Sequence, residues 1–175
     1  NEPFAIILPD MLISKSENQK NPGDSLKEMK KNFENYGISS ILLGKAKKEN
    51  ISKYGIAQIK KNHKFPGLGL IEKIIEKPSI RKAPSNYYAV GRYIFKNDLF
   101  DYLSKAKPDK SNEIQLTDTI DKYIADDNLV NASLLKGKIF DCGDYSEYIL
   151  ANLEFAIKDP HIESKIKDYL KKKLF

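Results

Sequence analysis

The sequence has few of the residues on which several protein classes depend. Its single cysteine, Cys142, excludes an internal disulfide framework. Its two histidines, His63 and His161, lie far apart in a lysine-rich turn and in the C-terminal tail, so we expect no histidine metal site. No apolar run approaches the roughly 18 residues of a transmembrane helix, and no signal peptide is recognisable. We therefore expect a soluble, cytoplasmic protein without a membrane partner.

The composition indicates an ordinary globular chain of mildly basic character. A hydrophobic content of 41% in 175 residues suits one domain with a normal core. The net charge of +6 is shared by nucleic-acid binders and phosphate-handling enzymes, so charge alone does not choose between them. The tyrosines fall mainly in strand and helix patterns rather than beside clustered lysines, and we therefore expect no nucleic-acid partner.

The apolar run from Phe4 to Leu8 predicts a central strand, buried on both faces by helices. A polar loop follows, and then a helix over 26–35 with Ser25 as N-cap and Gly37 at its end. A second strand over 38–43 completes a β-loop-α-β order. This order indicates an α/β fold with a parallel sheet and a right-handed crossover.

The rest of the chain alternates between strand and helix patterns. We expect a hairpin around Gly137, and a helix from Asp144 to Ile157 that begins with a capping box of Asp144 and Glu147. The remaining predicted elements are strands over 52–59, 71–77 and 87–95, the last interrupted by Gly91, helices near 97–103 and 117–124, hairpin strands over 130–135 and 138–140, and a final basic helix over 162–174.

Two acids follow apolar strand-like runs, where open α/β sheets bind ligands. Asp10 follows the first run after Pro9, and Asp141 follows the apolar pair Ile139-Phe140, with Gly143 two places further on. The alternative that Asp10 only caps the next turn stays open.

Three further positions combine chemistry with an unusual local setting. Gly55 lies near the start of a predicted strand and indicates either a bulge or the close approach of a ligand. Glu76 and Lys77 end another strand before Pro78. Because neighbouring strand residues point to opposite faces, we do not expect these two to pair unless the strand end twists, and they could serve different parts of one ligand. The alternative of two ordinary strand-end charges stays open.

Six short motifs in order resemble those of the bacterial UTP-glucose-1-phosphate uridylyltransferase (UDP-glucose pyrophosphorylase) family. They are Leu8-Pro9-Asp10, Tyr54-Gly55-Ile56, Glu76-Lys77-Pro78, Ala83-Pro84-Ser85-Asn86 with Gly91-Arg92-Tyr93, Glu113-Ile114-Gln115-Leu116-Thr117-Asp118, and Asp141-Cys142-Gly143. The resemblance covers essentially all 175 residues. It implies a nucleotide-diphospho-sugar transferase fold, a Rossmann-like, mixed and mostly parallel sheet between helices. Residues 1–175 would form the sugar-phosphate- and metal-binding portion of a single domain, with C-terminal helices from about 144.

The resemblance also implies a reaction, in which UTP and glucose 1-phosphate form UDP-glucose and pyrophosphate. Mg²⁺ would be the cofactor, and the partners would be glucose 1-phosphate, UTP or UDP-glucose, and further copies of the protein in a dimer or tetramer. The implied site residues are Asp10 and Asp141 on the metal, Lys77 and Asp10 in catalysis, and Gly55, Glu76, Lys77, Gly91 and Thr117 on the sugar phosphate.

One departure from the family pattern concerns the nucleotide. Members begin with a strand and a glycine-rich loop carrying Arg and Lys, which holds the triphosphate, and this sequence has no Gly-x-Gly-Thr-Arg-like stretch. We therefore expect that the N-terminal nucleotide-binding part is missing and that this fragment is inactive alone. The alternative is a catalytically inactive sugar-phosphate-binding or oligomerisation module.

Overall fold

The computed structural model describes residues 2–15, 21–109 and 112–174, which belong to two compact units. The sheet unit comprises Asn1–Ile7 and Gly23–Lys136, and the terminal unit comprises Leu8–Pro22 and Gly137–Phe175. The chain therefore passes between the units three times.

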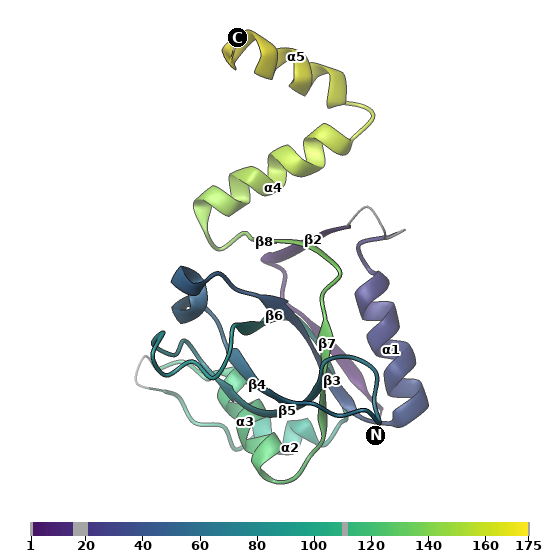
Figure 1. The fold of residues 1–175 in the computed structure, drawn as a ribbon, viewed down its shortest axis with the longest axis vertical. Helices are drawn as coiled ribbons and strands as arrows, with labels where there is room; N and C mark the ends of the chain where they lie inside the picture. The colour runs from purple at the N-terminus through teal and green to yellow at the C-terminus, as the bar shows by residue number, and fades with distance from the viewer. Residues whose placement is uncertain (1, 16–20, 110–111, 175) are drawn as a thin grey trace. The chain divides into compact units, whose positions relative to one another are not determined.

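The sheet unit is built on one six-stranded mixed sheet (Figure 1). Its order is β1 (Phe4–Ile7), β6 (Tyr87–Phe95), β3 (Ser39–Lys45), β7 (Val130–Leu134), β5 (Gly69–Ile75) and β4 (Ile56–Lys60), and a further pairing of Ile56 with Tyr88 joins β4 to β6. The α/β class and the mixed sheet are confirmed. The expectation of a mostly parallel sheet is wrong for the described residues, because only β3 and β7 pair in parallel.

Helices of the sheet unit lie on both sides of β3 and β7, as Figure 1 shows. On one side α1 (Asp24–Tyr36) contacts β3, β6 and β7, and on the other α3 (Leu116–Ala125) contacts β5 and carries α2 (Leu99–Leu103). A short 3₁₀ helix, η1 (Lys48–Lys53), precedes β4. Gly37 ends α1 in the left-handed conformation, as predicted, with φ of 63°.

Ser25 is not the N-cap of α1, which begins at Asp24 and has Gly23, two residues before Ser25, at the cap position and no side-chain cap. The Ser25 side chain is instead buried against the sheet unit, and its hydroxyl has no hydrogen-bond partner among the described residues. Helix boundaries inferred from sequence commonly err by one or two residues, and here that error changed the role of the serine.

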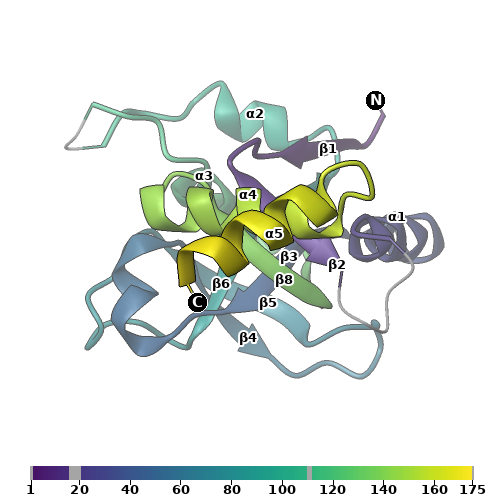
Figure 2. The same ribbon diagram turned by 90° about the horizontal axis from the view of Figure 1, so that it is seen from above.

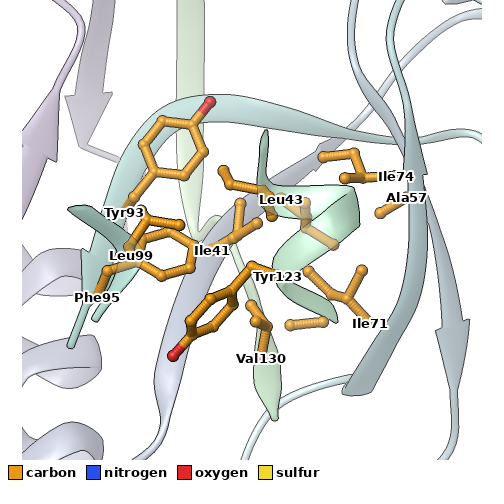
Figure 3. Close-up of a cluster of buried hydrophobic side chains, with 12 residues drawn as sticks. Ile41, Leu43, Ala57, Ile71, Ile74, Tyr93, Phe95, Leu99, Tyr123 and Val130 are labelled. Carbon is orange, nitrogen blue, oxygen red and sulfur yellow. The ribbon is translucent and has the colours of Figure 1, made fainter. Parts of the chain in front are cut away.

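The main hydrophobic core lies between the sheet and α3 (Figure 3). Ile120 and Tyr123 of α3 face it, as predicted from their helical spacing, and both are almost fully buried. The other buried members come from β3 to β7 and α2: Ile41, Leu43, Ala57, Ile71, Ile74, Tyr93, Phe95, Leu99, Val130 and Ala132.

Among the described residues, β1 lies at an edge of the sheet and not at its centre, where the prediction put it. Its strand partner there is β6, and Ile7 is 54% exposed. β1 and β3 do run in the same direction, since each is antiparallel to β6, but β6 separates them. An apolar run alone does not tell an edge strand from a central one.

The predicted hairpin around Gly137 is also wrong. β7 lies between β3 and β5 in the sheet unit, whereas β8 (Gly137–Asp141) pairs antiparallel with β2 (Met11–Lys15) in the terminal unit. β7 is buried almost throughout, pairs with β3 along one edge and has β5 on the other, so its neighbours in the sheet are strands far away in the chain and not β8.

The terminal unit continues from β8 into α4 (Tyr145–Lys158) and α5 (Glu163–Leu174). Asp144 caps α4 as predicted, because its Oδ1 accepts hydrogen bonds from the backbone N–H groups of Ser146 (3.0 Å) and Glu147 (3.3 Å). Figure 2 shows α4 and α5 from above. Within the described residues, no helix combines the length and apolar character needed to cross a membrane.

Candidate functional site

Gly55, Glu76 and Thr117 meet in the sheet unit, although the sequence separates them by up to 62 positions. A Cβ atom placed on Gly55 would lie 3.1 Å from Glu76 Oε2 and 3.1 Å from both Cγ2 and Oγ1 of Thr117. Such spacing is tighter than almost all real Cβ contacts, so the bare backbone of Gly55 lets the carboxylate and the hydroxyl come together. We call these three residues the glycine cluster.

Gly55 is not the strand bulge that was the commoner expectation. It precedes β4, whose only irregularity lies between Gln58 and Ile59. The other expectation, a close approach at Gly55, fits the structure, with the side chains of Glu76 and Thr117 as the approaching groups.

The segment Tyr54–Gly55 is held on two sides. The carbonyl of Tyr54 accepts a hydrogen bond from the N–H of Lys77 (3.1 Å), and the carbonyl of Gly55 accepts one from Ala89 (3.0 Å). The Tyr54 ring also stacks on Tyr88, with 4.5 Å between centroids. These contacts fix the glycine between the end of β5 and the start of β6.

Glu76 and Lys77 form an ion pair, which is the exception that the prediction allowed for a twisted strand end. Lys77 Nζ lies 3.9 Å from Glu76 Oε1. The strict alternation of side chains applies only while the strand is extended, but β5 ends at Ile75 and Lys77 has φ of 43°. The glutamate side chain is 20% exposed and the lysine 58%, so the pair is weak and the ammonium faces solvent.

Gly91 produces a bulge in β6. Its φ is 69°, and the register of β6 against β3 shifts where it lies, between the pairs Ile41–Tyr93 and Leu43–Ala89. Glycine adopts this conformation without steric cost, and a bulge re-aims the side chains that follow. Gly91 is therefore needed by the strand itself.

Sequence reasoning missed Tyr93, which follows this bulge. Burial, as the largest cause, and the negative charge of Glu76 together raise the pKa of Tyr93 to about 12, against the opposing charge of Arg92. The tyrosine is 5% exposed and belongs to the core in Figure 3. The only signal in the sequence was its place in the Gly91-Arg92-Tyr93 motif.

Asp10 and Asp141 meet in the terminal unit. Pairing of Met11 with Asp141 brings the acids to one end of the β2–β8 ladder, and the N–H of Cys142 donates to the carbonyl of Asp10 (2.8 Å). A Cβ on Gly143 would lie 3.1 Å from Asp141 Oδ1 and 3.8 Å from Asp10 Oδ2. Both carboxylates thus border the bare backbone of Gly143, and we call them the carboxylate pair.

The carboxylate pair creates a negative environment. Besides desolvation, the charges of Asp141 and Asp10 raise the pKa of the Cys142 thiol. Among the described residues no group of three or more His, Cys, Asp or Glu side chains is arranged as a metal site. Mg²⁺ nevertheless needs only one or two carboxylates when phosphate and water supply its other oxygens, so these two acids fit that ion.

Comparison with protein families places these residues in a known context. Residues 3–157 match the nucleotidyl transferase family. The chain is 38% identical over 173 residues to a UTP–glucose-1-phosphate uridylyltransferase of Haemophilus influenzae and 34% identical over 175 residues to that of Escherichia coli K12. These alignments cover 98% and 99% of this chain, but 58% and 57% of the two relatives.

Solved structures give the same picture. A crystal structure of UDP-glucose pyrophosphorylase complexed with UDP-glucose is similar with a TM-score of 0.81 and 36% identity, over 91% of this chain and 58% of that one. A UTP-bound enzyme from Acinetobacter baumannii has a TM-score of 0.78 and 27% identity, over 97% and 56% of the two chains. The chain therefore spans little more than half the length of the proteins it matches.

Proposed function

The chain belongs to the nucleotidyl transferase family, and we propose that it supplies the sugar-phosphate- and metal-binding part of a UTP–glucose-1-phosphate uridylyltransferase. The observation that carries this proposal is the convergence of Glu76 and Thr117 on Gly55 in a chain 38% identical to a relative of that name. An acceptor and a hydroxyl side by side suit recognition of a sugar with several hydroxyl groups.

The proposed reaction is a direct displacement. A phosphate oxygen of glucose 1-phosphate bonds to the α-phosphorus of UTP while the bond from that phosphorus to the pyrophosphate oxygen breaks, giving UDP-glucose and pyrophosphate. No covalent intermediate on the protein is needed, so the residues act by positioning and by neutralising charge.

Each site residue has a role in this scheme. Glu76, fixed against Gly55, accepts hydrogen bonds from glucose hydroxyls beside Thr117. The exposed ammonium of Lys77 neutralises the sugar phosphate, and Gly91 keeps the backbone of β6 open to the sugar. Asp10 and Asp141 would hold Mg²⁺, which supplies charge stabilisation for phosphate oxygens when bound.

The test uses the protein expressed from its complete reading frame. Asp10→Ala and Asp141→Ala should abolish formation of UDP-glucose from UTP and glucose 1-phosphate, whereas Asp127→Ala, which removes an acid from an exposed turn of the sheet unit, should not. Chromatographic detection of UDP-glucose with circular dichroism on each variant separates loss of activity from loss of fold. Wild-type turnover in either variant would remove that acid from the metal site.

A second candidate is a sugar-phosphate-binding or oligomerisation module without activity, which the lack of a Gly-x-Gly-Thr-Arg-like stretch in the sequence favours. A glycine-rich loop of that kind would be needed to hold a triphosphate, so the isolated chain should not make UDP-glucose. Binding of glucose 1-phosphate without turnover by the complete protein would favour the module.

The resemblance also leads us to expect a cytoplasmic protein that assembles as a dimer or tetramer. Cell fractionation and sedimentation of the complete protein would test these two expectations.

A further inference from the structure

Asp121 is an acid on the core-facing side of α3. Residues at positions i, i+3 and i+4 of a helix share a face, so Asp121 lies on the same face as Thr117 and the buried Ile120. An acidic residue is seldom found in such a stripe without a partner. Its partner is in β5, because Asp121 Oδ1 accepts a hydrogen bond of 2.8 Å from the backbone N–H of Ile74.

This hydrogen bond gives an acceptor to the backbone N–H of Ile74, which strand pairing in the sheet does not satisfy. β5 pairs with β4 along Ile71–Ile75, but with β7 only at Gly69 and Leu70. Ile74 is 2% exposed beneath α3, and a buried backbone N–H without a partner is costly. The carboxylate of Asp121 therefore ties α3 to the unpaired part of the β5 edge.

The hydrogen bond between Asp121 and Ile74 lies a short distance from the glycine cluster along both α3 and β5. Thr117 is four residues before Asp121, about 6 Å along the helix. Glu76 is two residues after Ile74, about 7 Å if the strand geometry continues. The distance from Asp121 back to Thr117 and the distance from Ile74 forward to Glu76 are therefore nearly equal. Because of this match, the contact of Asp121 with Ile74 sets Thr117 opposite Glu76.

We infer that Asp121 is a positioning residue for sugar recognition, which fixes the distance between the Thr117 hydroxyl and the Glu76 carboxylate at Gly55. Asp121 acts through its contact with β5 and does not itself belong to the glycine cluster. The consequence for substrate rests on the proposed function, whereas the geometric consequence does not.

The first arm of the test uses no ligand. Thr117 Cγ2 lies 3.1 Å from the ideal Cβ position of Gly55, so the complete protein should show a nuclear Overhauser effect between the Thr117 methyl and a Gly55 Hα. Asp121→Ala should weaken or remove this signal. Asp121→Asn, which keeps an acceptor oxygen, should retain it, and so should Asp118→Ala, which removes the exposed acid of the same helix.

The second arm measures steady-state kinetics of the same variants. Asp121→Ala should raise the apparent KM for glucose 1-phosphate about tenfold, since a displacement of about 1 Å at a site can cost up to 10²-fold. The KM for UTP should stay unchanged, kcat should fall less, and Asp121→Asn should restore wild-type values. If Asp121→Ala does not fold, Asp121→Ser takes its place, because its hydroxyl is too short to reach Ile74.

The outcomes separate the inference from the proposed function. An unchanged Thr117–Gly55 signal in Asp121→Ala, or its loss in Asp118→Ala as well, would overturn the positioning role. A wild-type protein without uridylyltransferase activity would refute the proposed function, and the ligand-free arm would still decide the role of Asp121.

Discussion

Lys77 combines a charged side chain with a backbone conformation that lysine rarely adopts. Its φ of 43° lies in the left-handed region, and the following Pro78 further disfavours any conformation other than an extended one. Local strain of this kind costs about 1–3 kcal/mol and persists when surrounding contacts enforce it, here the hydrogen bond from the Lys77 N–H to Tyr54. This strained backbone conformation places the ammonium of Lys77 beside Glu76, where we propose that the sugar phosphate binds.

Two substitutions of Lys77 should therefore separate strain from charge. Lys77→Gly should keep or raise the free energy of unfolding, by up to about 1 kcal/mol, because glycine accepts positive φ. Lys77→Ala should bring no such gain. Both should lower turnover about 10²–10³-fold in the complete protein, as expected when one preorganised charge is removed. Urea unfolding and initial rates provide the two measurements, and equal loss of stability in both variants would contradict the strain.

Tyr93 should make the stability of the protein sensitive to high pH. Its pKa is raised to about 12 in the folded state, against 10.0 for an unperturbed tyrosine, so between these pH values the folded state holds a proton that the unfolded state has lost. Stability from this group is fully present below pH 10 and is lost as the pH rises towards 12, by about 1.4 kcal/mol per pH unit at most.

Tyr93→Phe removes this titration and should flatten the dependence of unfolding free energy on pH in that window. Urea unfolding at several pH values from 9 to about 11.5 would give the difference in unfolding free energy between wild type and variant. The lysines titrate in both proteins, so their contribution cancels in this difference. Tyr36→Phe, at an exposed tyrosine of α1, is the matched control. Parallel curves for wild type and Tyr93→Phe would show that Tyr93 titrates normally.

At the level of elements, Asp144 is the start signal of α4. Asp144→Ala should destabilise this helix by about 0.5–2 kcal/mol, because the N–H groups of Ser146 and Glu147 lose their acceptor, whereas Asp144→Asn should retain most of the stability. Amide hydrogen exchange over α4 is the suitable measurement, since global unfolding need not report one helix. Equal protection in both variants would show that the cap contributes nothing.

Local signals predicted the elements well wherever one residue decides a conformation. Gly37 ended α1, Asp144 began α4, and the spacing of Ile120 and Tyr123 gave the buried face of α3. Pairing was predicted poorly, because it depends on partners far away in the chain. Nothing between Val130 and Phe140 indicates that β7 joins β3 in parallel while β8 joins β2.

The candidate site shows the same limit. Asp10, Glu76 and Asp141 could be selected as chemically informative and Thr117 followed from the family resemblance, but their grouping could not be derived from local sequence. Asp10 reaches Asp141 only through the β2–β8 ladder, and Glu76 reaches Lys77 only because the backbone leaves the strand conformation. The sequence does indicate Asp121, because an acid on a core-facing helix stripe is unusual. Its role, however, depends on the N–H of Ile74, which has no partner in the sheet and donates to Asp121.

At the level of the whole molecule, the sheet unit exposes an edge that soluble proteins normally protect. The outer edge of β1 has no strand partner among the described residues. Beside it lies an apolar cavity of about 490 Å³ between β1 and α1, lined among others by Phe4, Ala5, Leu26 and Phe33. An unpaired strand edge next to an apolar groove is a template for pairing with another chain.

We therefore expect the 175-residue chain to self-associate through β1 of a second copy. Sedimentation velocity should show species heavier than the 20.0 kDa monomer, in a proportion that rises with concentration. Ile7→Lys should shift the population towards monomer, because a charge on an edge strand opposes pairing, and Ile7 is already 54% exposed, so the change need not damage the core. Ile80→Lys adds the same charge at another exposed isoleucine of the sheet unit, 46% exposed and outside any strand, and should leave the association unchanged. A purely monomeric wild-type chain, or equal effects of the two lysines, would show that the β1 edge is not the contact.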